Sequence, residues 1–174
     1  METLEAIAKR TSTRKFKEIQ ISEENLQAIL KAGMSAPVGS GLYESLHITV
    51  IQDMDILNAI GYAVTEMVSA KFGKRMDKNF GAPTMIVVSS KPPVFLGLEY
   101  ANAACIIENM AIAATSLGID NIVWAGPTSI ISENEEIRKA VNIPEDFNPV
   151  LCISFGYGTE NNRPKKHKIT TNRI

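Results

Sequence analysis

The stretch EYANAACIIENMAIAATSL, residues 99–117, constrains the architecture most, because it predicts the longest helix of the chain. Apolar residues face almost every side of this helix, so most of its circumference has to be buried. Gly118 follows and is expected to end the helix. A chain of 174 residues has limited material to cover such a helix. We therefore expect a homodimer with this helix at its centre.

On both sides of this helix, the hydrophobic pattern predicts strands and shorter helices. Ser22 is expected to cap one helix and Gly33 to end it, and Ser132 with Glu135 has the spacing of a capping box for another. The pattern predicts a single domain over residues 1–174, a mixed α/β layer with helices on both faces of the sheet. The expected strands are 46–52, 84–89, 121–125 and 149–155, and the other expected helices are 2–9, 22–33, 53–70 and 132–141.

The composition is that of a globular chain, with 45% hydrophobic and 21% charged residues. The N-terminal segment is polar, and no apolar run is long enough to span a bilayer, so we expect no membrane partner and a cytoplasmic location. Cys105 and Cys152 lie in apolar runs, which favours buried thiols over a disulfide. His47 and His167 have no cysteine or acid at ligand spacing, so no metal site is expected.

Positive charge is concentrated at the two ends of the chain. Residues 1–17 hold five cations against two carboxylates, and residues 161–174 hold five cations and no acid. Because the whole chain has a net charge of −1, the residues between these ends carry −9. An acidic middle argues against a nucleic-acid partner bound on a broad face. A small anionic ligand held by both basic ends fits this distribution better.

The first basic segment is RTSTRKFK, residues 10–17, in which Arg10, Ser12 and Arg14 alternate. In an extended segment these three side chains point the same way. Two guanidiniums and a hydroxyl on one side suit a phosphate, because arginine donates in a fixed fork. A solvated turn is the alternative interpretation of the segment. Lys15 is expected to face solvent.

The usual catalytic motifs are absent from the sequence. It has no G-x-G-x-x-G after a strand, no phosphate-binding P-loop and no G-x-S-x-G elbow. His47 is expected to be a packed or edge-strand residue rather than a base. Without a strong acid–base group or nucleophile, an enzyme with this sequence needs a cofactor to carry the reactivity.

Several short motifs, in their order along the chain, resemble the nitroreductase family of FMN-dependent reductases. They are residues 10–14, 36–41, 81–83, 108–110, 117–119, 124–127 and 154–158, followed by the basic tail. Each motif alone has low specificity, but the resemblance covers nearly the whole chain. It implies an α+β fold with a mixed, mostly antiparallel sheet flanked by helices, in an intertwined homodimer.

The resemblance also implies the cofactor site. The two basic segments are expected to hold the flavin phosphate and ribityl chain, and the loop at 37–41 is expected beside the flavin of the partner subunit. The backbone at Ala125 and Gly126 is expected at flavin N5, and Trp124 either lines the flavin pocket or packs in the core. The cofactor-binding residues implied in this way are Arg10, Thr11, Ser12, Arg14, Pro37, Val38, Gly39, Gly41, Trp124, Ala125, Gly126, Lys166 and Lys168.

The implied activity is that of an FMN-dependent oxidoreductase. It accepts hydride from NADH or NADPH and reduces a nitroaromatic, a quinone or a similar small acceptor by a ping-pong mechanism. Val38, Gly41 and Tyr43 depart from the family pattern, and Lys168 stands where arginine is common, which leaves the FMN affinity open. A flavin-binding or flavin-delivering protein with little turnover is one alternative, and a basic-ended adaptor without a cofactor is another.

Overall fold

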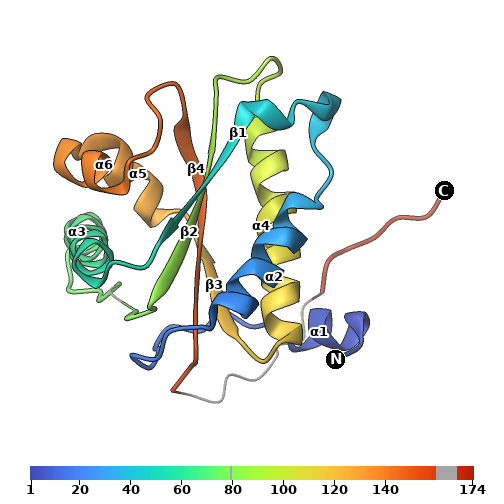
Figure 1. Cartoon of the computed structure of the whole chain (residues 1–174), viewed down its shortest axis with the longest axis horizontal. Helices are drawn as coiled ribbons and strands as arrows, with labels where there is room; N and C mark the ends of the chain where they lie inside the picture. Colours follow the sequence, from blue (N-terminus) through green and yellow to red (C-terminus); the bar gives the residue numbers. More distant parts are fainter. Residues whose placement is uncertain (79, 160–167) are drawn as a thin grey trace.

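The computed structural model describes residues 1–78, 80–159 and 168–174. Within these residues the chain forms a four-stranded sheet of order β1-β2-β4-β3, in which every neighbouring pair is antiparallel (Figure 1). The expected α+β class is confirmed. The strands are β1 Leu46–Ile51, β2 Thr84–Ser90, β3 Asp120–Trp124 and β4 Asn148–Gly156. The α-helices are α1 Thr3–Lys9, α2 Glu23–Met34, α3 Met54–Phe72, α4 Leu98–Ser116, α5 Gly126–Glu133 and α6 Glu135–Val141.

Helices cover both faces of the sheet, as expected. Figure 1 shows α2 and α4 on one face and α3, α5 and α6 on the other. One apolar core lies between α2, α4 and the sheet, around Ile29, Met110 and Phe155. A second lies between the sheet and α3, α5 and α6, around Ile60 and Val87. Because both faces are covered, every residue of the inner strand β2 is buried.

One side of α4 is buried and the other is exposed. Met110 and Ile107 are buried against α2 and the sheet. The expectation that Cys105 is buried is wrong, because it falls on the opposite side of the helix, whereas Cys152 is buried inside β4. Burial raises the pKa of the Cys152 thiol. The exposed residues along α4, named the α4 stripe below, are Tyr100, Ala101, Ala104, Cys105 and Glu108.

Two expectations about helix ends are wrong. Gly33 does not end α2, which continues to Met34. Gly33 is instead a packing position, because a Cβ there would lie 2.3 Å from Cε of Met110. Ser132 lies inside α5, a helix missed by the sequence analysis, and Asn134 caps α6 by accepting a hydrogen bond from the N–H of Ile137 (3.0 Å).

Candidate functional site

Backbone hydrogen bonds fix the basic segment 10–17 to the end of the sheet. The N–H of Thr13 donates to the carbonyl of Asn121, in β3 (3.0 Å). The N–H of Lys17 donates to the carbonyl of Tyr157, just after β4 (2.8 Å). The segment therefore crosses the sheet end from the edge strand β3 to the neighbouring strand, and its side chains are held on a rigid support.

Most side chains of this segment are exposed or half-buried, and its two buried residues are Thr13 and Phe16. Thr13 is buried, Arg10 and Ser12 are half-buried and Arg14 is exposed. A guanidinium nitrogen of Arg14 donates to the carbonyl of Ser12 over 3.4 Å, which is a long hydrogen bond. Among the ion pairs of the described residues, none involves Arg10 or Arg14. Both guanidiniums are therefore available to an anion, and this donor set fits a phosphate.

β3 leads from the basic segment to the start of α5. Ser12 pairs with Asn121 near the beginning of β3, and Ala125 and Gly126 follow its end. β3 has five residues. At a rise of roughly 3.3 Å per residue, its two ends are about 13 Å apart. At the start of α5, the N–H of Gly126 has no partner within the helix, Pro127 has no N–H, and the N–H of Thr128 donates to the carbonyl of Ala125 (3.1 Å). The basic segment and the N–H of Gly126 therefore lie at opposite ends of one edge strand.

Trp124 and Gly126 pack the start of α5 closely against α3. A Cβ on Gly126 would lie 2.8 Å from Cγ1 of Val64. The indole N–H of Trp124 donates to Oγ of Ser154 (3.0 Å), and its ring centroid lies 4.9 Å from that of Phe80. Trp124 is half-buried and lines a small hollow between α3 and the sheet. Trp124 is therefore packed in the core and also borders a hollow.

The loop at 37–41 lies at the other end of α4. The N–H of Gly39 donates to Oδ1 of Asn102, near the start of α4 (2.9 Å). Asn121, which pairs with the basic segment, donates from Nδ2 to Oγ1 of Thr115 near the end of α4 (3.2 Å). Asn102 and Thr115 are about 20 Å apart along the helix axis, at 1.5 Å per residue. Within one chain, the loop and the basic segment are therefore not brought together.

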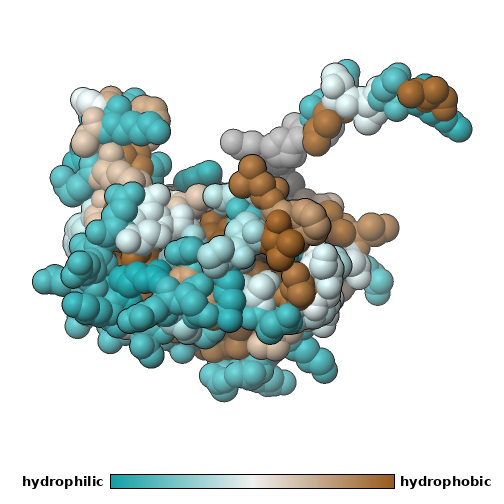
Figure 2. Space-filling view, turned by 90° about the horizontal axis from the view of Figure 1, so that it is seen from above, coloured by the Kyte–Doolittle hydropathy of each residue, from teal (hydrophilic) through white to brown (hydrophobic). Residues whose placement is uncertain are grey.

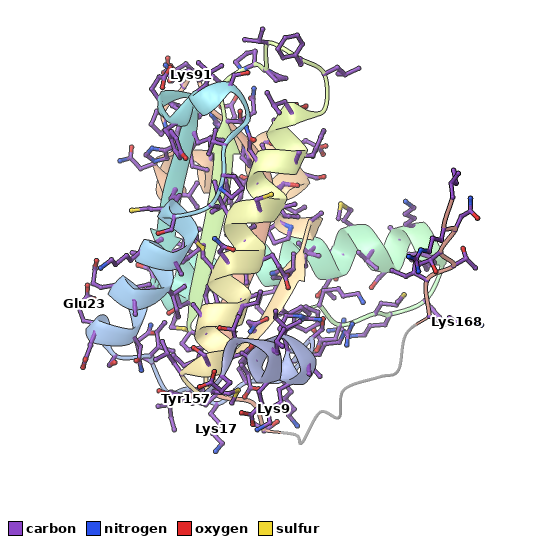
Figure 3. The ribbon with its side chains drawn as sticks, turned by 90° about the vertical axis from the view of Figure 1, so that its right-hand side faces the viewer. Lys9, Lys17, Glu23, Lys91, Tyr157 and Lys168 are labelled. Atoms are coloured by element: carbon purple, nitrogen blue, oxygen red, sulfur yellow. The ribbon has the colours of Figure 1, made fainter. Side chains whose placement is uncertain are left out.

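Residues 168–174 lie away from the body of the chain (Figure 2). Figure 3 shows Lys168 far from Lys9 and Lys17, which mark the ends of the N-terminal basic region. Residues 168–174 are all exposed, and the predicted site residue Lys166 lies outside the described residues. Within one chain, Lys168 is therefore not brought to the basic segment.

Two polar residues that position the site were missed by the sequence analysis. Oδ2 of Asp120 accepts a hydrogen bond from the N–H of Gly158 (2.7 Å). Asn121 is buried and ties β3 to α4 through its contact with Thr115. Both precede the apolar run of β3, and two polar residues at the start of a buried strand are a signal that could have identified them.

His47 is an edge-strand residue, as expected. It lies in β1, and its ring centroid is 5.4 Å from that of Phe147. β1 and β3 are the two outer strands of the sheet, so His47 lies at the opposite edge from the basic segment. Among the described residues, no group of three or more histidines, cysteines or acids is placed to hold a metal ion.

None of the helices in the described part of the chain has the length and apolar character needed to cross a membrane.

Solved structures with a similar fold span almost the whole chain. A nitroreductase from Bacteroides fragilis, solved with bound FMN, is 28% identical with a TM-score of 0.81, over 100% of this chain and 97% of that one. A nitroreductase from Desulfitobacterium hafniense, also with bound FMN, is 29% identical with a TM-score of 0.81, over 99% of this chain and 100% of that one.

Sequence comparison agrees with the fold. A protein of Archaeoglobus fulgidus, provisionally named an NADH dehydrogenase/NAD(P)H nitroreductase, is 32% identical over 90% of this chain and 85% of its own length. The model of the nitroreductase family matches residues 7–157, which include the basic segment, the loop at 37–41 and the start of α5. On this match and on the shared fold, the chain belongs to the nitroreductase family.

Proposed function

We propose that this protein is a homodimeric FMN-dependent oxidoreductase. It takes hydride from NADH or NADPH and passes electrons to a nitroaromatic, a quinone or a similar small acceptor in a ping-pong sequence. One observation carries the proposal: the backbone that carries Arg10 and Arg14, which have no ion pair among the described residues, is held at one end of β3, and the N-terminus of α5 lies at the other.

The basic segment supplies the donors that a flavin phosphate needs. Arg10 and Arg14 can each donate two hydrogen bonds to a phosphate, and the hydroxyl of Ser12 lies between them in the sequence. Thr11 and Lys168 are further donors in the proposal. FMN ends in such a phosphate, and no adenylate-binding motif that would favour FAD is present.

The start of α5 supplies the second set of contacts. Ala125 and Gly126 would present backbone N–H groups to the flavin ring, about the length of β3 away from the phosphate donors. Bound FMN supplies the hydride-accepting chemistry that the side chains lack. The chain itself binds and orients the cofactor and excludes water from it. No described side chain is proposed as an acid or base. His47, at the far edge of the sheet, takes no part in this proposal.

A homodimer would complete the site. The loop at 37–41 is about 20 Å along α4 from the basic segment of its own chain. Pairing two chains through the α4 stripe would cover its small and aromatic residues, and the loop of one chain could then reach the site of the other. In this arrangement Pro37, Val38, Gly39 and Gly41 contact the partner's cofactor.

The absorption spectrum of the purified protein tests the proposal. We expect a bound-flavin spectrum, release of FMN rather than FAD on heating, and reduction of the bound flavin by NADH or NADPH without oxygen. FMN binding without reduction would instead support a flavin-delivering protein. If saturating FMN leaves no protein-bound spectrum, the proposal fails.

A further inference from the structure

A second group of cations lies at the C-terminal end of α3. Lys71, Lys74, Arg75 and Lys78 fall close together, with a single acid among them. Between residues 18 and 160 the chain holds eight cations and seventeen acids, so half of the cations of this acidic part are gathered here. Clustered like charge is unfavourable by itself and is relieved by binding an anion.

The chain after α3 is held against the helix. The N–H of Met76 donates to Oγ of Ser69 (2.9 Å), and the N–H of Lys78 donates to Oγ1 of the buried Thr65 (2.8 Å). Gly73, with a φ of 63°, makes the turn that allows this return. The connection is therefore ordered by two hydrogen bonds, and it keeps the cations near the helix end.

The cations at this end are exposed and lie close in the sequence to an exposed aromatic residue. Lys71, Lys74 and Arg75 are exposed, and no ion pair of the described residues involves them. Phe72, the last residue of α3, has an exposed fraction of 60%. An aromatic face stacks on a purine base, and neighbouring cations bind phosphate oxygens. This combination of groups suits a phosphorylated adenosine.

The helix links this group of residues to the candidate site. Val64 packs beside Gly126 at the start of α5, and Phe72 lies eight residues later, about 12 Å along the axis of α3. Figure 3 shows α3 running out beyond the sheet toward this end. In a nicotinamide dinucleotide, two riboses and a pyrophosphate separate the nicotinamide from the adenine, and such a spacer can cover this distance.

We propose that Lys71, Phe72, Lys74 and Arg75 form a subsite for the adenosine 2′-phosphate end of NADPH. The 2′-phosphate is absent from NADH and is close to doubly charged at neutral pH. The subsite therefore makes NADPH the preferred donor. This inference rests on the proposed function, because it assigns the donor of the same reaction.

Calorimetric titration of fragments tests the subsite without turnover. The probes are 2′,5′-ADP, 3′,5′-ADP and 5′-AMP, titrated into the protein as purified. We expect 2′,5′-ADP to bind about tenfold more tightly than either of the other two. Equal binding of 2′,5′-ADP and 5′-AMP would overturn the proposal, and so would equal binding of 2′,5′-ADP and 3′,5′-ADP.

Matched variants test whether the preference for 2′,5′-ADP comes from the residues of the proposed subsite. Lys74→Gln with Arg75→Gln should reduce the preference for 2′,5′-ADP over 5′-AMP to about twofold or less. The control, Lys31→Gln with Lys139→Gln, removes two exposed charges elsewhere and should keep the preference. Phe72→Ala should weaken all three probes about tenfold, because it removes base stacking. If the two double variants lose the preference for 2′,5′-ADP over 5′-AMP equally, the preference comes from the diffuse electrostatic field of the whole protein. That result would overturn the proposed subsite.

Steady-state kinetics separates this inference from the proposed function. With FMN-loaded protein, the ratio of kcat/KM for NADPH to that for NADH should fall about tenfold in the Lys74→Gln, Arg75→Gln variant. If that ratio is unchanged while both nucleotides are oxidised, the subsite fails and the proposed function stands. If neither nucleotide is oxidised but 2′,5′-ADP binds selectively, the proposed function fails and the adenosine subsite stands.

Discussion

The two ends of α4 hold two parts of the proposed site in different ways. Near its end, the segment 10–17 is bound to β3 and to the chain after β4 by backbone hydrogen bonds at 3.0 and 2.8 Å. Near its start, the loop at 37–41 has one side-chain anchor, the contact of Gly39 with Asn102. The basic segment buries Thr13 and Phe16, whereas every residue of the loop is exposed or half-buried.

In the proposed site, one part is therefore positioned within a single chain and the other part requires a second chain. The phosphate donors of the proposal are positioned by the fold of a single chain, so they need no partner. The loop lies about 20 Å along α4 from those donors, so in the proposal it contributes to a cofactor site only when a second chain covers the α4 stripe. Variants at the stripe, the basic segment and the loop anchor should therefore have distinct effects.

The largest effect is expected from Ala104→Arg, in the middle of the α4 stripe. If the stripe is the dimer interface, the change buries an unpaired charge, which costs several kcal/mol. Sedimentation should show a monomer at micromolar concentration, and FMN affinity should fall with it. Glu66→Arg, on an exposed position of α3, is the control and should remain dimeric. A dimer of unchanged stability in Ala104→Arg would contradict this placement of the interface.

Thiol labelling gives a second measurement on the same interface. Cys105 is exposed in the single chain, and Cys152 is buried. In the native dimer, we expect neither thiol to react rapidly with a thiol reagent. In Ala104→Arg, one thiol per chain should react. Rapid labelling of Cys105 in the wild-type dimer would place the interface elsewhere.

The next effect is expected at the basic segment. Arg14→Ala removes a bidentate donor and should weaken FMN binding by roughly 2–5 kcal/mol if the phosphate is left without its partner. Lys15→Ala removes the same charge one residue away and should cost less than about 1 kcal/mol. FMN titrations of both variants at two salt concentrations compare them. Equal weakening that disappears at high salt would mean a diffuse basic patch, and the assignment of Arg10 and Ser12 would fail with it.

A smaller effect is expected at the loop anchor. Asn102→Ala leaves the N–H of Gly39 without its acceptor and should reduce the free energy of unfolding by about 1–3 kcal/mol. Because the proposed dimer uses the loop in the partner's site, FMN affinity should also fall, while sedimentation should still show a dimer. Urea unfolding and FMN titration measure the two effects. If the free energy of unfolding falls but the FMN affinity is unchanged, the loop does not contribute to FMN binding.

The smallest effect is expected from an ion pair at the same end of the molecule as the loop. Nζ of Lys91 lies 3.0 Å from Oδ2 of Asp146, and the hydrogen bond from Lys91 holds the pKa of this carboxyl below its ordinary value of 3.8. Because this pKa is below 3.8 in the folded state, the ionised carboxylate of Asp146 stabilises the fold above pH 3.8. This stabilisation is lost as the pH falls through the lowered pKa.

Asp146→Asn removes this pH-dependent contribution. The urea midpoints of wild type and variant should differ slightly near neutral pH, because both side chains are partly exposed, and should converge as the pH falls below 3.8. A difference that grows as the pH falls would contradict the sign of the shift.

Short-range patterns in the sequence predicted most of the elements. Ser22 caps α2 by accepting a hydrogen bond from the N–H of Asn25, as its position before two acids indicated. The four strands follow from runs of β-branched and other apolar residues, and their bounds differ from the prediction by a few residues. α5 was missed because only eight residues form it and its start, Gly126 and Pro127, was interpreted as part of a loop.

The sequence alone determined the family, the α+β class and the composition of the basic segment, because local periodicity and residue chemistry carry that information. Only the tertiary structure decided that Cys105 faces outward, that Gly33 serves packing against Met110, and that the loop at 37–41 lies a helix length from the basic segment. The physical reason is that these features depend on which side of α4 meets the sheet. That choice is made by contacts between residues far apart in the chain, such as Gly39 with Asn102 and Asn109 with Ala32, and no local pattern reports them.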